Sequence, residues 1–159
     1  MILKKLFSIL FILLFIFSCD DKIIKEVKEI HENGKPKVVE LFSEKDSVKE
    51  LIKTEKYNLS NQLISEEFHL KEQLIEYSYH TKGNIRTILD GNPDIGYMKM
   101  SYYHKEGPLN FYGEVVDFTR HGRWSFYYLD ETLEREEFYN KGDEITKEEW
   151  ENLKKTETN

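Results

Sequence analysis

The sequence lacks the features that mark the common chemistries of catalysis and metal binding. It has one cysteine, Cys19, among 159 residues, which excludes an internal disulfide and any zinc site built on several cysteines. It contains no Gly-x-Ser-x-Gly motif and no glycine-rich phosphate loop, so two signatures of hydrolases and nucleotide-binding proteins are missing. We therefore expect a protein that is not an enzyme and that uses no metal or other cofactor.

An excess of basic residues is also missing. The chain has 23 Lys and Arg against 30 Asp and Glu. Residues 1–18 contain two lysines and no acidic residue, so the remaining 141 residues carry 23 − 2 = 21 basic and 30 acidic groups, a net charge of −9. A surface this acidic argues against general electrostatic attraction to nucleic acid or anionic lipid. We expect no nucleic-acid partner.

No apolar run is long enough for a transmembrane helix, which needs about 20 residues. Residues 6–17 form a run of twelve that only Ser8 interrupts, and Lys4 and Lys5 precede it. A short basic segment followed by an apolar run of this length is typical of a signal peptide. The sequence therefore predicts a targeting segment at the N-terminus, formed as a signal helix.

The only cysteine stands where this apolar segment ends. Cys19 follows Ser18 and precedes two aspartates, an arrangement that resembles the lipobox of bacterial lipoproteins. The resemblance implies that residues 1–18 are a cleaved signal peptide and that Cys19 becomes the acylated first residue of a tether at 19–25. It also implies a place in the cell envelope, at the outer membrane or cell surface rather than the inner membrane. The alternative is that Cys19 is an ordinary apolar residue of an uncleaved anchor.

The rest of the chain is repetitive. Turn residues recur at spacings of 27, 22, 24 and 24, at Gly34, Asn61, Gly83, Gly107 and Glu131. A tyrosine stands four residues before each of the last four turns, at Tyr57, Tyr79, Tyr103 and Tyr127. Aromatic and β-branched runs bounded by Gly, Asn and Asp predict a strand on each side of every turn. Residues 90–94 and 119–122 are the predicted joins between units.

These units predict an all-β fold. A single hairpin is marginally stable in water, so we expect about five hairpins over residues 26–145 to join into one elongated, twisted antiparallel sheet. Residues 22–28 fit either a strand or a tether. Thr146 and Glu149 form a capping-box pattern that predicts a short helix over 146–155, whose Trp150 and Leu153 would cover the end of the sheet. Residues 156–159 are expected to be disordered.

Three segments resemble the MORN-repeat variant family. Residues 122–128 read Gly-x-Trp-x-x-Tyr-Tyr, residues 132–142 end in Tyr-x-x-Gly, and residues 57–67 carry the Tyr, Asn and Leu of another unit. The resemblance covers about residues 26–145 and implies a scaffold of β-hairpin repeats. Similar bacterial proteins are often described as YwqK-type antitoxins, so the resemblance also raises an antitoxin role as an alternative.

Two motifs that suggest metal binding are better explained by turns. His80 and His104 occupy the same repeat position, but no third ligand recurs with them, so we expect no metal there. Residues 90–94 imitate the start of a calcium loop, but Ile95 and Ser101 stand where such a loop needs Gly and Glu. We expect an Asn-Pro turn whose aspartates cap backbone amides.

The aromatic surplus is the remaining functional signal. An open single-layer sheet hides one face only, so exposed rings on the other face would suit a contact surface. The candidate residues are Tyr57, Tyr79, Tyr103, Tyr127 and Trp124. The alternative is that coiling of the sheet or the C-terminal helix buries both faces.

We therefore expect a membrane-anchored, non-enzymatic module that binds a protein or glycan partner in the envelope. An immunity or antitoxin-like protein and a purely structural envelope component are the alternatives.

Overall fold

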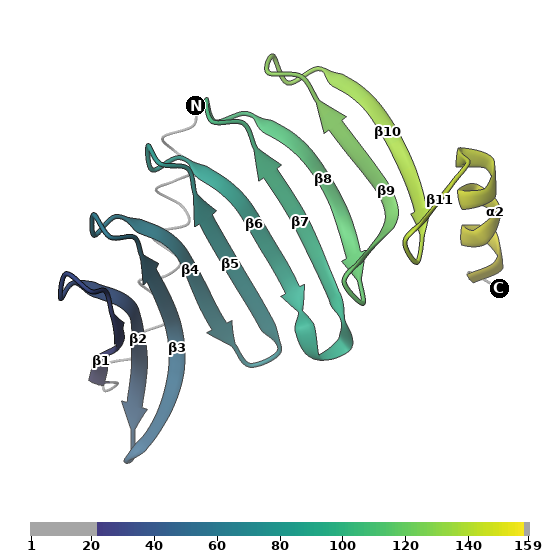
Figure 1. Ribbon diagram of the computed structural model, residues 1–159. Helices are drawn as coiled ribbons and strands as arrows, with labels where there is room; N and C mark the ends of the chain where they lie inside the picture. Colours follow the sequence, from purple (N-terminus) through teal and green to yellow (C-terminus); the bar gives the residue numbers. More distant parts are fainter. Residues whose placement is uncertain (1–21, 158–159) are drawn as a thin grey trace.

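The computed structural model describes residues 22–157, which form one open sheet of eleven strands (Figure 1). Every strand pairs antiparallel with the next strand along the chain, which confirms the predicted elongated all-β fold. The signal segment 1–18, Cys19, residues 20 and 21 and the last two residues lie outside the described part. The strands are β1 (Lys22–Ile30), β2 (Pro36–Lys45), β3 (Val48–Tyr57), β4 (Leu63–Leu70), β5 (Gln73–Tyr79), β6 (Ile85–Asn92), β7 (Tyr97–Tyr103), β8 (Leu109–Val116), β9 (Thr119–Tyr127), β10 (Leu133–Asn140) and β11 (Asp143–Ile145).

Five turns along one edge of the sheet share a single geometry. By edge we mean here the side of the sheet that the strand ends form, not an outermost strand. They occupy residues 31–35, 58–62, 80–84, 104–108 and 128–132. In each, the fourth amide donates to the first carbonyl, and the first amide donates to the fifth carbonyl, over 2.8–3.0 Å. The fourth residue has positive φ every time, at Gly34, Asn61, Gly83, Gly107 and Glu131. This is a type I turn followed by a left-handed residue, and it confirms the predicted hairpin repeat.

The connections at the opposite edge are of more than one kind, and three of them are two-residue turns with positive φ at both residues, at 46–47, 117–118 and 141–142. Between β6 and β7 lies the 3₁₀ turn η1 (Pro93–Ile95), and the Asn92 side chain, rather than an aspartate, accepts the Asp94 amide at 2.9 Å. The predicted join at residues 119–122 is wrong because those residues open β9. The chain reverses instead at Asp117 and Phe118, whose φ angles are both positive.

Both ends of the described chain differ slightly from the expected limits. β1 begins at Lys22, so residues 22–25 belong to the sheet rather than to a tether. The helix α2 (Lys147–Glu157) runs two residues beyond the predicted end, so residues 156 and 157 are helical rather than disordered. Thr146 and Glu149 form the predicted capping box. Within residues 22–157, no helix has the length and apolarity needed to cross a membrane.

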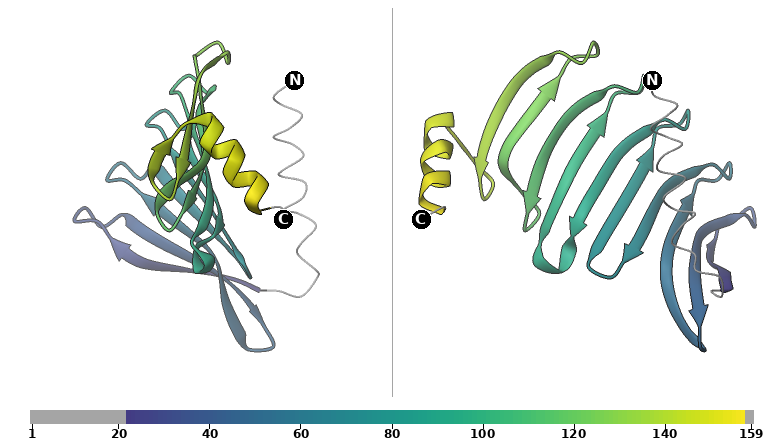
Figure 2. Two further views of the ribbon diagram at one scale, coloured as in Figure 1. Left: turned by 90° about the vertical axis from the view of Figure 1, so that its right-hand side faces the viewer. Right: turned by 180° about the vertical axis from the view of Figure 1, so that it is seen from behind.

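The largest packed core lies on one face of the C-terminal half. Trp124, Phe126 and Tyr139 are buried there on β9 and β10, and Phe111 of β8 packs against them. Figure 2 shows the sheet twisting along its length, with α2 beside its last strands. Among residues 22–157 no second sheet or layer of helices covers this sheet, so aromatic rings and long polar side chains cover its faces.

Candidate functional site

The four repeat tyrosines form a row along the edge that carries the five similar turns. Tyr57, Tyr79, Tyr103 and Tyr127 are the last residues of β3, β5, β7 and β9, and all four are half-buried. Strands lie about 4.8 Å apart, so successive tyrosines recur about every 10 Å across the sheet. We call these four residues the tyrosine row.

The tyrosine row lies on a single face of the sheet. Beside each tyrosine the pairing register shifts by one residue, and the extra residue belongs to the strand after the turn. The tyrosine strand itself therefore keeps its alternation, with successive side chains on opposite faces. Tyr103 accordingly points away from Tyr102, and Tyr127 away from Phe126. The row thus occupies the face opposite the Trp124 core.

Hydrogen bonds to carboxylates hold two members of the row. The hydroxyl of Tyr57 donates to Glu55 at 2.7 Å, and that of Tyr79 donates to Glu66 at 2.8 Å. The Lys53 ammonium contacts both carboxylates, at 3.0 Å for Glu55 and 2.6 Å for Glu66. These contacts restrict the motion of the Tyr57 and Tyr79 rings.

The same contacts shift the protonation equilibria. Burial and the hydrogen bond to Glu55 raise the pKa of Tyr57 to about 12, and burial and the bond to Glu66 raise the pKa of Tyr79. Burial alone would raise the pKa of Glu55, but the bonds from Tyr57 and Lys53 outweigh it and leave that pKa below its usual range. Neutral tyrosines beside ionised glutamates make hydrogen-bonding contact groups and poor nucleophiles.

The recurring histidines link one hairpin to the next. A ring nitrogen donates to the carbonyl of the row tyrosine in the following hairpin, over 2.9 Å from His31, 3.0 Å from His80 and 3.2 Å from His104. In the second turn Asn58 replaces the histidine and bonds within its own turn. The sequence showed that His80 and His104 recur but not this structural role. Among residues 22–157, no group of three or more His, Cys, Asp or Glu side chains could hold a metal ion.

Trp124 does not belong to the predicted contact surface. It lies on the opposite face with only 2% of its area exposed, and its indole Nε1 donates to the Glu114 carbonyl at 3.1 Å. The Arg120 guanidinium covers the ring 4.7 Å from its centroid, while the absence of a side chain at Gly113 leaves room beneath it. A partner therefore has no access to Trp124, which is a core residue.

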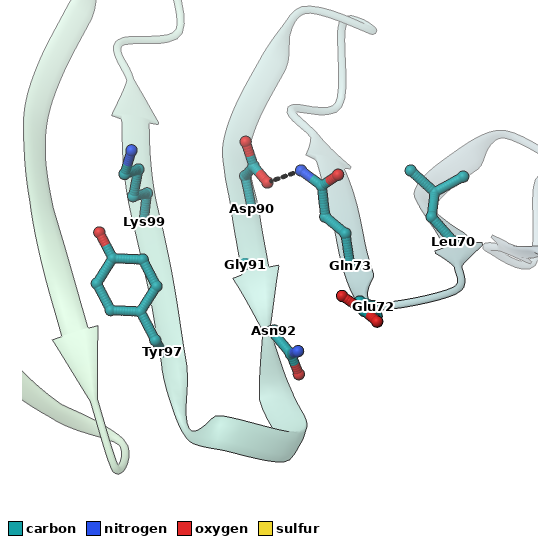
Figure 3. A pocket seen from close by; sticks show the side chains of 8 residues that line it. All are labelled: Leu70, Glu72, Gln73, Asp90, Gly91, Asn92, Tyr97 and Lys99. Atoms are coloured by element: carbon teal, nitrogen blue, oxygen red, sulfur yellow. Dashed lines mark hydrogen bonds between the residues drawn. The ribbon is translucent and has the colours of Figure 1, made fainter.

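A shallow hollow of about 520 Å³ lies on the face of the tyrosine row, near the opposite edge (Figure 3). Gln73, Asp90 and Lys99 line it from three neighbouring strands, and Gln73 donates to Asp90 at 2.5 Å. Burial and a hydrogen bond to Glu114 raise the pKa of Tyr97, another lining residue, to about 12. The hollow extends the polar, aromatic character of this face; Asp90 and Asn92 belong to the turn motif identified in the sequence, whereas the lining residues outside residues 90–94 carry no sequence signal that marks them.

No family model and no curated protein matches the chain. Among solved structures, the chain is similar to a protein of unknown function from Bacteroides fragilis NCTC 9343, with 13% identity over 79% of this chain and 88% of that one. The TM-score of 0.23 is too low to support any conclusion about fold or function. The resemblances to MORN-repeat variants and to lipoproteins therefore remain predictions.

Proposed function

We propose that this protein is a non-enzymatic binding module of the bacterial cell envelope, anchored by lipid at Cys19, that holds a protein or glycan partner on the face of its tyrosine row. The observation that carries the proposal is the placement of four equivalent tyrosines on one face. Tyrosine suits such a surface because it offers a large ring and a polar hydroxyl at low entropic cost.

The regular spacing favours an extended partner. A row with a period of about 10 Å offers the same contact several times to a peptide or glycan lying across the strands. Hydrogen bonds to Glu55 and Glu66 hold two of the rings before binding. Less side-chain freedom is then lost on binding, which raises affinity without adding contacts.

The anchor is a separate part of the proposal. The lipobox pattern at Cys19 supports it, and several acyl chains hold a protein stably on a bilayer where one chain would not. Labelled palmitate is expected to enter the wild-type protein and not a Cys19→Ala variant. Equal labelling of the two proteins, or none in the wild type, would contradict the anchor.

Replacing the tyrosine row tests the binding surface. The native lipoprotein would be captured from detergent-solubilised membranes, its partner identified by mass spectrometry, and the purified pair titrated. Changing Tyr79, Tyr103 and Tyr127 together to Ser is expected to weaken partner binding at least tenfold, because the rings supply most of the apolar contact area.

Two controls keep this experiment interpretable. Phe118→Ser removes an exposed ring from the opposite edge and should leave partner binding unchanged. Replacing the same three tyrosines by Phe keeps the rings and the packing, and circular dichroism reports whether each variant is folded. A folded triple Ser variant with wild-type affinity would refute the tyrosine row as the binding surface.

A further inference from the structure

Four consecutive connections at the edge opposite the tyrosine row each place one exposed large apolar side chain at this edge, in the connection itself for Ile95 and Phe118 and at the adjoining strand end for Val48 and Leu70. The exposed fractions are 62% for Val48, 50% for Leu70, 70% for Ile95 and 92% for Phe118. In an antiparallel sheet whose strands follow chain order, the turns that follow β2, β4, β6 and β8 lie along one edge (Figures 1 and 2). The four side chains, here called the apolar edge, recur about every 10 Å over about 29 Å.

Phe118 is the most unusual member of this edge. It occupies a two-residue turn in a left-handed conformation, with φ of 63° after a φ of 49° at Asp117. Such turns favour Asn and Gly, and a bulky residue there is strained. With 92% of its area exposed, the ring gains almost no packing within the chain to offset that strain. Strain of this kind at an exposed site points to a contact outside the chain.

The proposed lipid anchor joins the sheet at the same edge. Lys22, the first residue of β1, pairs with Glu44, which is one residue from the end of β2 and so close to the turn that precedes Val48. Cys19 precedes Lys22 by three residues, a length of chain that spans at most about 11 Å. Acyl chains on Cys19 would therefore hold this edge close to the bilayer surface.

We propose that the apolar edge rests on the membrane, with Val48, Leu70, Ile95 and Phe118 entering the interfacial region of the lipid. This inference rests on the proposed anchor at Cys19. The sheet would then stand on its edge, with the tyrosine row at the far side, directed away from the bilayer and toward a partner.

The contact is apolar rather than electrostatic. Each of these turns also carries a carboxylate, at Asp46, Glu72, Asp94 and Asp117, so the edge lacks the basic cluster that would attract anionic lipid. The expected lipid is therefore zwitterionic, and the insertion should depend little on salt.

Fluorescent labels at the two edges test the orientation. A single cysteine would be placed at Phe118 in the full-length lipoprotein, where acylation protects Cys19 from the label, and at Leu129 in a second protein. Leu129 is a matched control because it is 51% exposed on a turn of the opposite edge. In phosphatidylcholine vesicles containing a spin-labelled lipid, we expect quenching at position 118 to exceed that at 129 at least threefold. A label at Ile95 should behave as at 118.

Each outcome bears on a distinct part of the proposal. Equal quenching at 118 and 129 in protein that mass spectrometry shows to be acylated would overturn the orientation and leave the anchor intact. If the expressed protein carries no acyl chains and does not bind vesicles, both the proposed anchor at Cys19 and the proposed orientation are overturned. The emission of the label at position 118 would also be measured in detergent without lipid. A blue shift of this emission that increases with protein concentration would show that the edge contacts a second copy of the chain, which also overturns the membrane contact.

Discussion

Gly113 and Trp124 show how a single-layer sheet buries a large ring at the scale of one residue. A Cβ atom built on Gly113 would lie 2.2 Å from Cδ2 of Trp124, so the indole rests directly on the neighbouring backbone. Phe111 and Tyr139 flank the ring at centroid distances of 5.7 and 6.5 Å. In a two-layer fold a second layer of structure would bury such a ring. Here the missing side chain at Gly113 leaves the space in which the indole packs against the sheet.

Gly113→Ala is expected to destabilise the protein by about 1–3 kcal/mol, the usual cost of overpacking a close-packed site. Urea titration followed by tryptophan fluorescence measures the change. Lys99→Ala, an exposed substitution on β7, should stay within about 0.5 kcal/mol of wild type. A Gly113→Ala protein as stable as the Lys99→Ala control would show that the ring does not lie on the glycine.

The burial of Trp124 also marks what the sequence could not predict at this scale. Alternation along β9 correctly separates Trp124 and Phe126 from Tyr127, because successive strand residues face opposite sides. Alternation does not show how deeply a side chain is buried. The burial of Trp124 depends on its contacts with Gly113 and Arg120, which arise from strand pairing and packing rather than from the local sequence pattern.

At the scale of elements, local turn chemistry decides what the sequence predicts well. The five similar turns were predictable because glycine or asparagine stands at most of the left-handed positions, and the repeat spacing identifies Glu131 as the fifth. The turn at Asp117 and Phe118 was misplaced because phenylalanine is not typical of a left-handed position. The proposed membrane contact supplies a functional reason for a phenylalanine at this left-handed position.

The helix α2 protects the C-terminal end of the sheet. The Glu149 carboxylate accepts the Thr146 amide at 2.7 Å, and the Thr146 hydroxyl accepts the Glu149 amide at 3.2 Å. One turn later, Trp150 meets the His121 ring edge to face at a centroid distance of 5.8 Å. The capping box therefore positions the ring that attaches the helix to β9.

Thr146→Ala should weaken the helix by about 1 kcal/mol, the typical cost of losing an N-cap side chain. Hydrogen exchange of the amides in residues 147–157 measures this loss locally, with an expected fivefold acceleration. Thr156→Ala is the matched control, because that hydroxyl bonds only to the Leu153 carbonyl in the last turn. If both variants exchange at the same rate, the capping box does not stabilise α2.

At the scale of the whole molecule, the stabilising contacts are unevenly distributed. β9 and β10 contain Trp124, Phe126, Phe138 and Tyr139, four of the five buried hydrophobic residues among those described. In β1 to β3, Val39 is the one buried hydrophobic residue. These strands rely instead on exposed or half-exposed ion pairs such as Lys28 with Glu40 at 3.2 Å. Such pairs contribute at most about 1 kcal/mol each. The repeats predicted the length of the sheet but not this gradient, since it depends on which side chains meet across strands.

This gradient predicts that the molecule opens from its N-terminal end. Each hairpin packs only against its neighbours, so the hairpins can unfold one after another rather than together. In native-state hydrogen exchange, amides of β1 to β3 should open with a free energy at least 2 kcal/mol lower than those of β9 and β10, about a thirtyfold difference in protection. Salt at 1 M should widen the difference by screening the N-terminal ion pairs. A single opening free energy across all five hairpins, unaffected by salt, would instead show that the sheet unfolds as one cooperative unit despite its uneven core.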